Sequence, residues 1–212
     1  MPDLRPIDNW IELHSGKKFN PASFSGFNVK LDDIFVVLPR LCRYNGHTKR
    51  FYSVAEHCIL MAEYVAKQSW ATPRDVLVAL HHDDAEYVLS DLVRPIKQDM
   101  PEFKIMEQLV EKVVFGALGL PTTLPNWLHT LDLQILVDER KHVINPSSNT
   151  WAIDGQPGLG VKPWKFMWRF ESYVRWRFKR MHYKWMKRYA DQLRQLAEGV
   201  DPNSELLKAS TY

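Results

Sequence analysis

The sequence ALHHDDAEY, residues 79–87, places two histidines, two aspartates and a glutamate directly behind an apolar run. Thr72-Pro73-Arg74-Asp75 precedes it with the features of a helix start: threonine at the N-cap, proline at the first helical position and aspartate in the first turn. We expect one helix to run through residues 79–87. Glu86 then lies four residues after His82 and three after Asp83, so the three side chains can share one space. The alternative is a solvated polar helix end.

Helical patterns continue on both sides of this stretch. Ser53-Val54-Ala55-Glu56 has the form of a capping box and places His57 in the first turns of a helix. Pro101 to Leu118 is amphipathic and is closed by Gly119, and Pro125 opens a further helix that runs to about Val143. The fold class expected from these patterns is all-α.

The N-terminal part is less regular. Asp32-Asp33 can cap a short helix through residues 34–38, which Pro39 interrupts. Residues 1–30 carry scattered glycine and proline, and we expect irregular structure there with a short strand or hairpin near Lys18-Phe19.

Composition indicates a globular, water-soluble protein. The 212 residues are 45% apolar and 25% charged, and the net charge of +3 is too small to indicate nucleic-acid binding by the whole chain. The N-terminus has no apolar signal core, and the longest apolar runs are too short to span a bilayer. We expect a cytoplasmic protein without a membrane partner. Cys42 and Cys58 are expected to be free thiols, with Cys58 buried.

Four side chains on three expected helices are candidate metal ligands. Asp132 lies beside an apolar stripe, where a lone charge is costly and needs a partner. If His57, His82, Asp83 and Asp132 converge, they form a site with two nitrogens and two oxygens that suits a divalent transition metal and leaves positions open for water and substrate.

The series His, then His-Asp, then a distant Asp, resembles the HD-domain superfamily of metal-dependent phosphohydrolases. The likeness covers roughly Leu13 to Val143 and is closest in LCRYNGHTKRFYSVAEH, residues 41–57, and DDAE, residues 83–86. This pattern is similar to the nucleotide-acting branch, which includes bacterial 5′-deoxynucleotidases and phage dATP triphosphohydrolases. The resemblance implies an HD-domain helical bundle, a deoxynucleotide substrate and the metal ligands His57, His82, Asp83 and Asp132.

The resemblance also implies roles around the metal. Glu86 would orient or deprotonate the attacking water, or protonate the leaving group, and Asp83 would act in catalysis as a ligand. Substrate contacts are implied for Arg43, Tyr44, His47, Arg50, Asp91 and Lys97. Because residues 43–50 offer more cations than one phosphate requires, we lean towards a dATP-type triphosphate substrate, with a deoxynucleoside monophosphate as the alternative.

Several points stay open at the level of sequence. The metal can be Zn, Co, Mn, Fe or Ni, and a second divalent ion can accompany the phosphates. The doublets His81-His82 and Asp83-Asp84 leave the register open, and we choose His82-Asp83 because only these are adjacent as His-Asp. His81 and His129 are interpreted as buried or surface histidines rather than as outer-shell partners or ligands of a second ion.

The C-terminal part has the most unusual composition of the chain. From Trp164 to Tyr189 there are ten aromatic residues and nine Lys or Arg against a single acid, Glu171. We divide the chain into a catalytic domain (1–150), a C-terminal helical extension (151–200) and a tail (201–212). We expect the extension to form a homo-oligomer interface rather than to bind nucleic acid. The alternative function is a nucleic-acid-binding or regulatory protein with a structural HD-like core.

Overall fold

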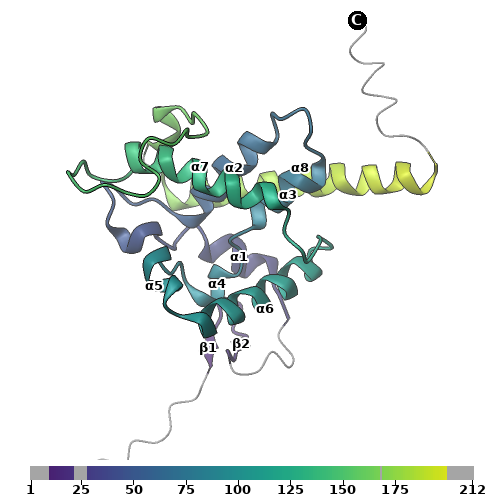
Figure 1. Ribbon diagram of the computed structural model, residues 1–212. Coiled ribbons are helices and arrows are strands. Elements are labelled where there is room, and N and C mark those ends of the chain that lie inside the picture. Colours follow the sequence, from purple (N-terminus) through teal and green to yellow (C-terminus); the bar gives the residue numbers. More distant parts are fainter. Residues whose placement is uncertain (1–9, 22–27, 168, 200–212) are drawn as a thin grey trace, which may run out of the picture.

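The computed structural model of the protein is an all-α fold, as expected, and describes residues 10–21, 28–167 and 169–199 (Figure 1). The expected tail, 201–212, lies outside the described residues. The helices are α1 (Leu31–Val37), α2 (Val54–Val65), α3 (Pro73–His81), α4 (Glu86–Leu89), α5 (Arg94–Gln98), α6 (Pro101–Ala117), α7 (Asn126–His142) and α8 (Glu171–Ala197). Two short 3₁₀ helices, η1 (Arg43–Gly46) and η2 (Pro163–Phe166), complete the helical elements.

The core is built around α3. Residues 76–80 of this helix, VLVAL, are apolar on every side and fully buried, which is the pattern of a helix enclosed by other helices. Helix α3 packs against α2 and α8. Helix α8 contributes Val174 and Phe178 to the core, four residues apart and therefore on one helix face. The expected extension thus supplies part of the same core as the expected catalytic domain.

Local sequence determines where the main helices begin. The expected capping box of Ser53 with Glu56 starts α2, and the expected N-cap Thr72 starts α3, where it also forms a capping box with Asp75. Such reciprocal hydrogen bonds satisfy backbone groups that a helix start leaves without partners. Helix α6 ends before Gly119, whose φ of +66° lies in the left-handed region that glycine adopts most easily.

Two expectations for helix boundaries were wrong. Asp32 and Asp33 do not cap α1, because Lys30 occupies the N-cap. The buried Asp33 carboxylate accepts hydrogen bonds from the Ser15 backbone N–H at 2.6 Å and the Ser15 hydroxyl at 2.8 Å. The helix through residues 79–87 also does not form, because α3 stops at His81 and a turn precedes α4. At Asp33, a tertiary contact with Ser15 replaces the expected local cap.

The remaining elements surround this core. The expected hairpin is present as two antiparallel strands, β1 (Ile11–Glu12) and β2 (Lys18–Phe19), with Ile11 opposite Phe19. In Figure 1, α1, α4, α5 and α6 lie below the group of α2, α3, α7 and α8, and the second half of α8 projects beyond the body. Within the described residues, no helix combines the length and the apolar character needed to cross a membrane.

Candidate metal centre

The turn after α3 presents the His-Asp pair. Four backbone N–H groups of this turn bond to carbonyls three residues earlier, Asp84 to His81 and Glu86 to Asp83 at 3.0 Å, Tyr87 to Asp84 at 3.1 Å and Val88 to Ala85 at 3.3 Å. This spacing is tighter than the four-residue spacing of an α-helix. Residues three apart lie on one side of such a turn, so Asp83 and Glu86 face the same space. Adjacent His81 and His82 point to different partners.

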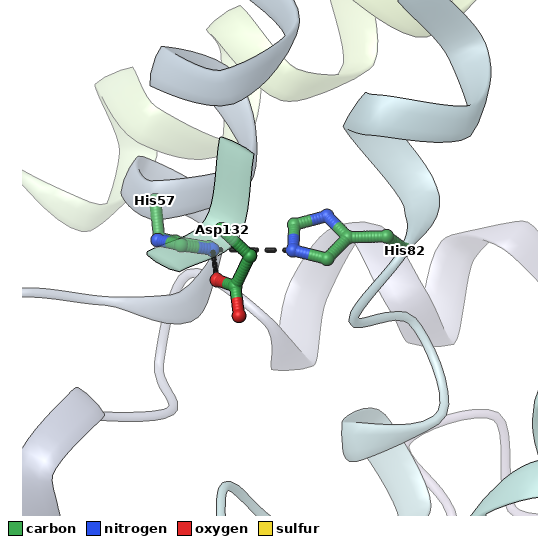
Figure 2. Close-up of side chains that lie close together, drawn as sticks. All are labelled: His57, His82 and Asp132. Atoms are coloured by element: carbon green, nitrogen blue, oxygen red, sulfur yellow. Dashed lines mark hydrogen bonds and ion pairs between the residues drawn. The ribbon is translucent and has the colours of Figure 1, made fainter. Parts of the chain in front are cut away.

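Four side chains from α2, the turn and α7 meet at one point. His57 Nε2 lies 3.2 Å from His82 Nε2, 3.3 Å from Asp132 Oδ1 and 3.6 Å from Asp83 Oδ2. His82 Nε2 lies 3.3 Å from Asp83 Oδ1. Figure 2 shows His57, His82 and Asp132 pointing towards one another. His57, His82 and Asp132 form one group that could hold a metal ion, and Cys58, His82 and Asp83 form another. The structure therefore brings all four expected ligands together.

Glu139, a buried carboxylate that the sequence analysis did not identify, contacts His57 at the ring nitrogen that faces away from the other candidate ligands. Glu139 is fully buried and lies 2.7 Å from His57 Nδ1. It also accepts hydrogen bonds from the hydroxyls of Tyr44 and Tyr52, the latter at 2.9 Å. Arg43 Nε lies 3.5 Å from the same carboxylate. A carboxylate on one ring nitrogen fixes the orientation of the imidazole and directs the other nitrogen towards the metal position.

Charge interactions hold the cluster in defined protonation states. Burial and Arg43 lower the pKa of His57, but Glu139 and Asp132 together raise it to about 9. Burial raises the pKa of Asp132, and the stronger combined effect of His57, His82 and Arg43 brings it well below its usual range. Glu139 and Asp132 thus favour the protonated form of His57. A divalent cation bound at the cluster would replace the added proton of His57.

A pocket of about 600 Å³ opens beside the cluster. His82, Asp83 and Asp132 line one part of it, and Glu86, Lys97 and residues of α6 and α7 line the rest, including Glu107, Glu111 and His129. The Oε2 atom of Glu86 is buried and has no hydrogen-bond partner among the described residues. Burial, together with Asp83 and Asp91, raises the pKa of Glu86 well above its usual value. A carboxyl group that can hold a proton therefore lies next to the candidate ligands.

The other wall of the pocket is also acidic. Lys97 Nζ lies 2.6 Å from Glu107 and is neutralised by it. Burial and the neighbouring Glu107 raise the pKa of Glu111 to about 7. The sequence analysis gave no role to Glu107 and Glu111, although their spacing of four residues on an amphipathic helix places them on one face. Apart from the candidate ligands, the pocket holds more carboxyl groups than cations.

Of the six expected substrate contacts, only Lys97 lines this pocket. Arg43 lies at its edge, 3.2 Å from Asp83, and Asp91 interacts electrostatically with Arg43 and Asp83. Tyr44 directs its hydroxyl to Glu139 and its ring towards Trp151, with ring centres 6.3 Å apart.

The remaining two expected contacts lie elsewhere. His47 is exposed in the loop that follows η1. Arg50 lies 3.9 Å from Glu56 and donates a hydrogen bond to the Phe51 carbonyl at 3.1 Å. The cations of residues 43–50 are thus not gathered at the pocket: Arg50 is held by Glu56, and His47 is exposed.

His81 connects the turn to the C-terminal helix. Its Nδ1 lies 2.6 Å from Asp84 and its Nε2 lies 3.0 Å from Nδ1 of His182 on α8. All three side chains are buried. Burial and the neighbouring His81 lower the pKa of His182 to about 3, so this imidazole is neutral. His81 was expected to be a buried or surface histidine, and it is buried.

Cys58 and His129 are the two remaining residues for which an expectation was stated. Cys58 is fully buried, as expected, and burial raises the pKa of its thiol well above the usual value. His129 lines the pocket one helical turn before Asp132 but does not belong to either group of candidate ligands. Glu139 could have been found in the sequence, because it follows Asp132 by seven residues and so lies on the same face of α7.

Comparison with known proteins gives the chain a family. No family model matches the sequence. The chain is 30% identical over 145 residues to the uncharacterized protein YfdR of Escherichia coli K12, in a match that covers 68% of this chain and 78% of YfdR. The chain belongs to the YfdR family. It is also 32% identical over 123 residues to an uncharacterized protein of Rhodobacter capsulatus, a match that covers 55% of this chain and 61% of that protein.

Neither relative of the YfdR family carries an activity in its name, so the chemistry is argued from the site. Two imidazole nitrogens and carboxylate oxygens form a donor set that suits divalent transition metals and leaves coordination positions for other ligands. The pocket provides space beside those positions, and Glu86 provides a group for proton transfer. This arrangement in a YfdR-family protein is suited to metal-assisted hydrolysis of a small substrate.

Proposed function

We propose that this protein is an HD-type, metal-dependent phosphohydrolase that removes phosphate from a deoxynucleotide. The observation that carries the proposal is the meeting of His57, His82, Asp83 and Asp132 beside a pocket that also contains the unpartnered Glu86. The order of these residues in the sequence is the order that led to the HD-domain resemblance. The all-α architecture and the donor set both support the proposal.

His57, His82, Asp83 and Asp132 would hold the ion. A divalent ion bound there supplies a Lewis acid that acidifies water and polarises a phosphoryl oxygen. Zn, Co, Mn, Fe and Ni all accept such ligands. Glu139 keeps His57 oriented through Nδ1, and Arg43 holds Asp83 in place at 3.2 Å. The protein thereby keeps the ligands in position before substrate arrives.

Glu86 is the proposed group for proton transfer. Burial and the neighbouring Asp83 raise the pKa of Glu86 well above its usual value, and Glu86 lies on the pocket wall three residues after Asp83. It can protonate a leaving alkoxide or, in its ionised form, take a proton from the attacking water. A positioned acid or base of this kind contributes on the order of 10²- to 10⁴-fold in rate.

The charges in the pocket favour a monophosphate over a triphosphate. The preference for a dATP-type triphosphate over a monophosphate depended on the cations of residues 43–50. The pocket lining contains none of these cations. Its single ammonium group, on Lys97, is already paired with Glu107. A triphosphate carries about four negative charges and needs several donors along its length. We therefore take a deoxynucleoside 5′-monophosphate as the proposed substrate and dATP as the alternative.

The test combines a substrate screen with a ligand test. Protein stripped by a chelator is reloaded with each of the five metals and assayed for phosphate release from dAMP, dADP, dATP and the corresponding nucleotides of the other bases. We expect hydrolysis of at least one monophosphate, with a higher kcat/KM than for its triphosphate. Absence of phosphate release with every metal and nucleotide would refute the proposal.

Two aspartate variants and one cysteine control identify the ligands. Asp132→Ala and Asp83→Ala should each lose bound metal and activity together, because each removes a charged donor. Cys58→Ala, which changes an equally close buried side chain, should retain stoichiometric metal. If Cys58→Ala lost its metal while Asp132→Ala kept a normal metal content, the ion would be assigned to the second candidate group, Cys58, His82 and Asp83.

A further inference from the structure

A second hollow, of about 430 Å³, lies on the outer side of α8 and shares no residue with the candidate metal centre. Five cationic side chains and one acid line it: Lys165, Arg169, Arg177, Arg180, Lys184 and Glu63. This local excess of four positive charges is larger than the net charge of +3 of the whole chain. The positive charge of the protein is therefore concentrated at this hollow.

The part of α8 that lines the hollow forms a continuous stripe, which we call the α8 stripe. It consists of Tyr173, Trp176, Arg177, Arg180, Met181 and Lys184. The spacings of three and four residues place these side chains on one side of the helix. The buried residues Val174, Phe178 and His182 lie on another side, against the core. Helix α8 thus has one face for packing and a separate face with cations and aromatic rings.

Some of these cations are fixed and others are free to bind a ligand. Glu63 on α2 holds Arg177 and, at 2.8 Å, Lys165. In the described part of the chain, no acidic side chain lies within ion-pair distance of Arg180 or Lys184, and both are exposed. Among the described residues, the buried Nε of Arg169 has no hydrogen-bond partner, and its Nη2 donates to the Trp164 carbonyl at 3.3 Å. Glu63 therefore fixes two of the five cations in the hollow. The other three, Arg169, Arg180 and Lys184, have no acid within ion-pair distance among the described residues.

Two aromatic rings lie open among these cations. The rings of Tyr173 and Trp176 are 5.8 Å apart at an angle of 32° and are 43% and 51% exposed. The Arg180 guanidinium lies 5.1 Å from the centre of the Trp176 ring. Burying this much aromatic surface in a partner would be favourable, and nothing in the described core covers it. Exposed rings between unneutralised cations suit a ligand that has both flat apolar faces and negative charges.

The shape and charge of the hollow discriminate between possible partners. A symmetric contact between two copies would bring the same stripe of positive charge face to face, which is unfavourable. The homo-oligomer expected from the sequence is therefore not supported on this face. Duplex nucleic acid keeps its bases stacked and unavailable to Tyr173 and Trp176. Single strands expose their bases, and proteins bind them with aromatic platforms and cationic grooves.

We propose that the α8 stripe binds single-stranded nucleic acid, with bases stacked on Tyr173 and Trp176 and phosphates contacted by Arg169, Arg180 and Lys184. Lys187 and Arg188 follow on the next turn of α8 and extend the cationic face. Binding of this kind depends on backbone charge and stacking, so little sequence preference is expected. The site is separate from the pocket proposed for deoxynucleotide hydrolysis, and either proposal can fail alone.

Fluorescence anisotropy of a labelled oligothymidylate of twelve nucleotides tests the proposal on the full chain. Each phosphate contact contributes about 0.7 to the slope of log affinity against log salt for single strands. The paired variant Arg180→Gln with Lys184→Gln should weaken binding and reduce this slope by about 1.4. Trp176→Ala should weaken binding about five- to a hundredfold and leave the slope unchanged, because stacking carries no charge.

Control variants and competitors make the result specific. Lys104→Gln with Lys112→Gln removes the same charge from α6, which lies away from α8 (Figure 1), and should bind as the wild type does. Asp132→Asn should also bind normally. Equal losses in the α6 variant, no binding at low salt, or equal competition by polyglutamate or dTMP would each overturn the proposal. So would a wild-type dimer that the Arg180 and Lys184 variant converts to a monomer without any change in affinity for the oligonucleotide.

Discussion

Exchanging Glu139 for glutamine removes a buried charge next to His57 while it preserves the shape of the side chain. The pKa of Glu139 is lowered from an ordinary value of 4.5 to about 2, and at 1.36 kcal/mol for each pH unit this corresponds to about 3 kcal/mol of stability. That contribution is present above pH 4.5 and is lost as the pH falls towards 2. At pH 7 we therefore expect Glu139→Gln to lower the free energy of unfolding by about 3 kcal/mol, measured with urea.

The same exchange should change metal affinity in a way that depends on pH. In the metal-free protein a proton occupies His57 up to a pKa of about 9, and metal must displace it. Wild-type affinity should therefore rise about tenfold per pH unit from pH 7 to pH 9. Glu139→Gln removes the main charge that holds this proton, so its affinity should rise less steeply.

Above pH 9, where no proton competes, only the lost orientation of His57 remains, and affinity should be about 10- to 100-fold weaker than in the wild type. The assay is competition with a chromogenic chelator in metal-buffered solutions at pH 7.0, 8.0 and 9.5. Tyr52→Phe is the matched control, because it removes a hydrogen bond to the same carboxylate without changing its charge. Equal affinities of wild type and Glu139→Gln at pH 9.5 would refute the reasoning.

Three further changes separate the roles of individual groups. Glu86→Gln should keep the metal, measured by elemental analysis, and lower kcat about 10²- to 10⁴-fold; loss of metal would make Glu86 a ligand. Arg50→Ala should leave the ratio of kcat/KM values for dAMP and dATP unchanged, since Arg50 contacts Glu56 and not the pocket; a selective loss with dATP would restore the triphosphate as the substrate. The pKa of His182 is about 3 in the folded protein and about 6.5 when unfolded, so protonation below pH 6.5 destabilises the fold. The stability difference between wild type and His182→Asn, measured with urea, should be about 2 kcal/mol smaller at pH 5 than at pH 7.5, and an equal difference at both would show that His182 does not titrate as inferred.

Local patterns predicted the main helices, because the signals that start them are local, and the order of the candidate ligands in the sequence led to the prediction that their side chains converge. Capping boxes at Ser53 and Thr72 need only residues three apart, and the apolar stripe around Asp132 already indicated a buried partner. The break after His81 was not predicted, and the contact of His81 with His182, one hundred and one residues away, has no local signal in the sequence. The substrate contacts in residues 43–50 stay predictions, and the positions of these side chains also depend on partners such as Asp83 and Glu139, which are distant from Arg43 in the sequence.

The link between His81 and His182 has a consequence for how the chain acquires its structure during synthesis. Helix α8 follows all the candidate ligands in the chain, and until Phe178 and His182 leave the ribosome, α3 lacks its contact with α8 and Nε2 of His81 lacks its contact with His182. Domains made early in a chain can fold before the rest emerges. Because His81 is adjacent to the candidate ligand His82, we expect the candidate metal centre to become able to bind metal only after α8 has emerged.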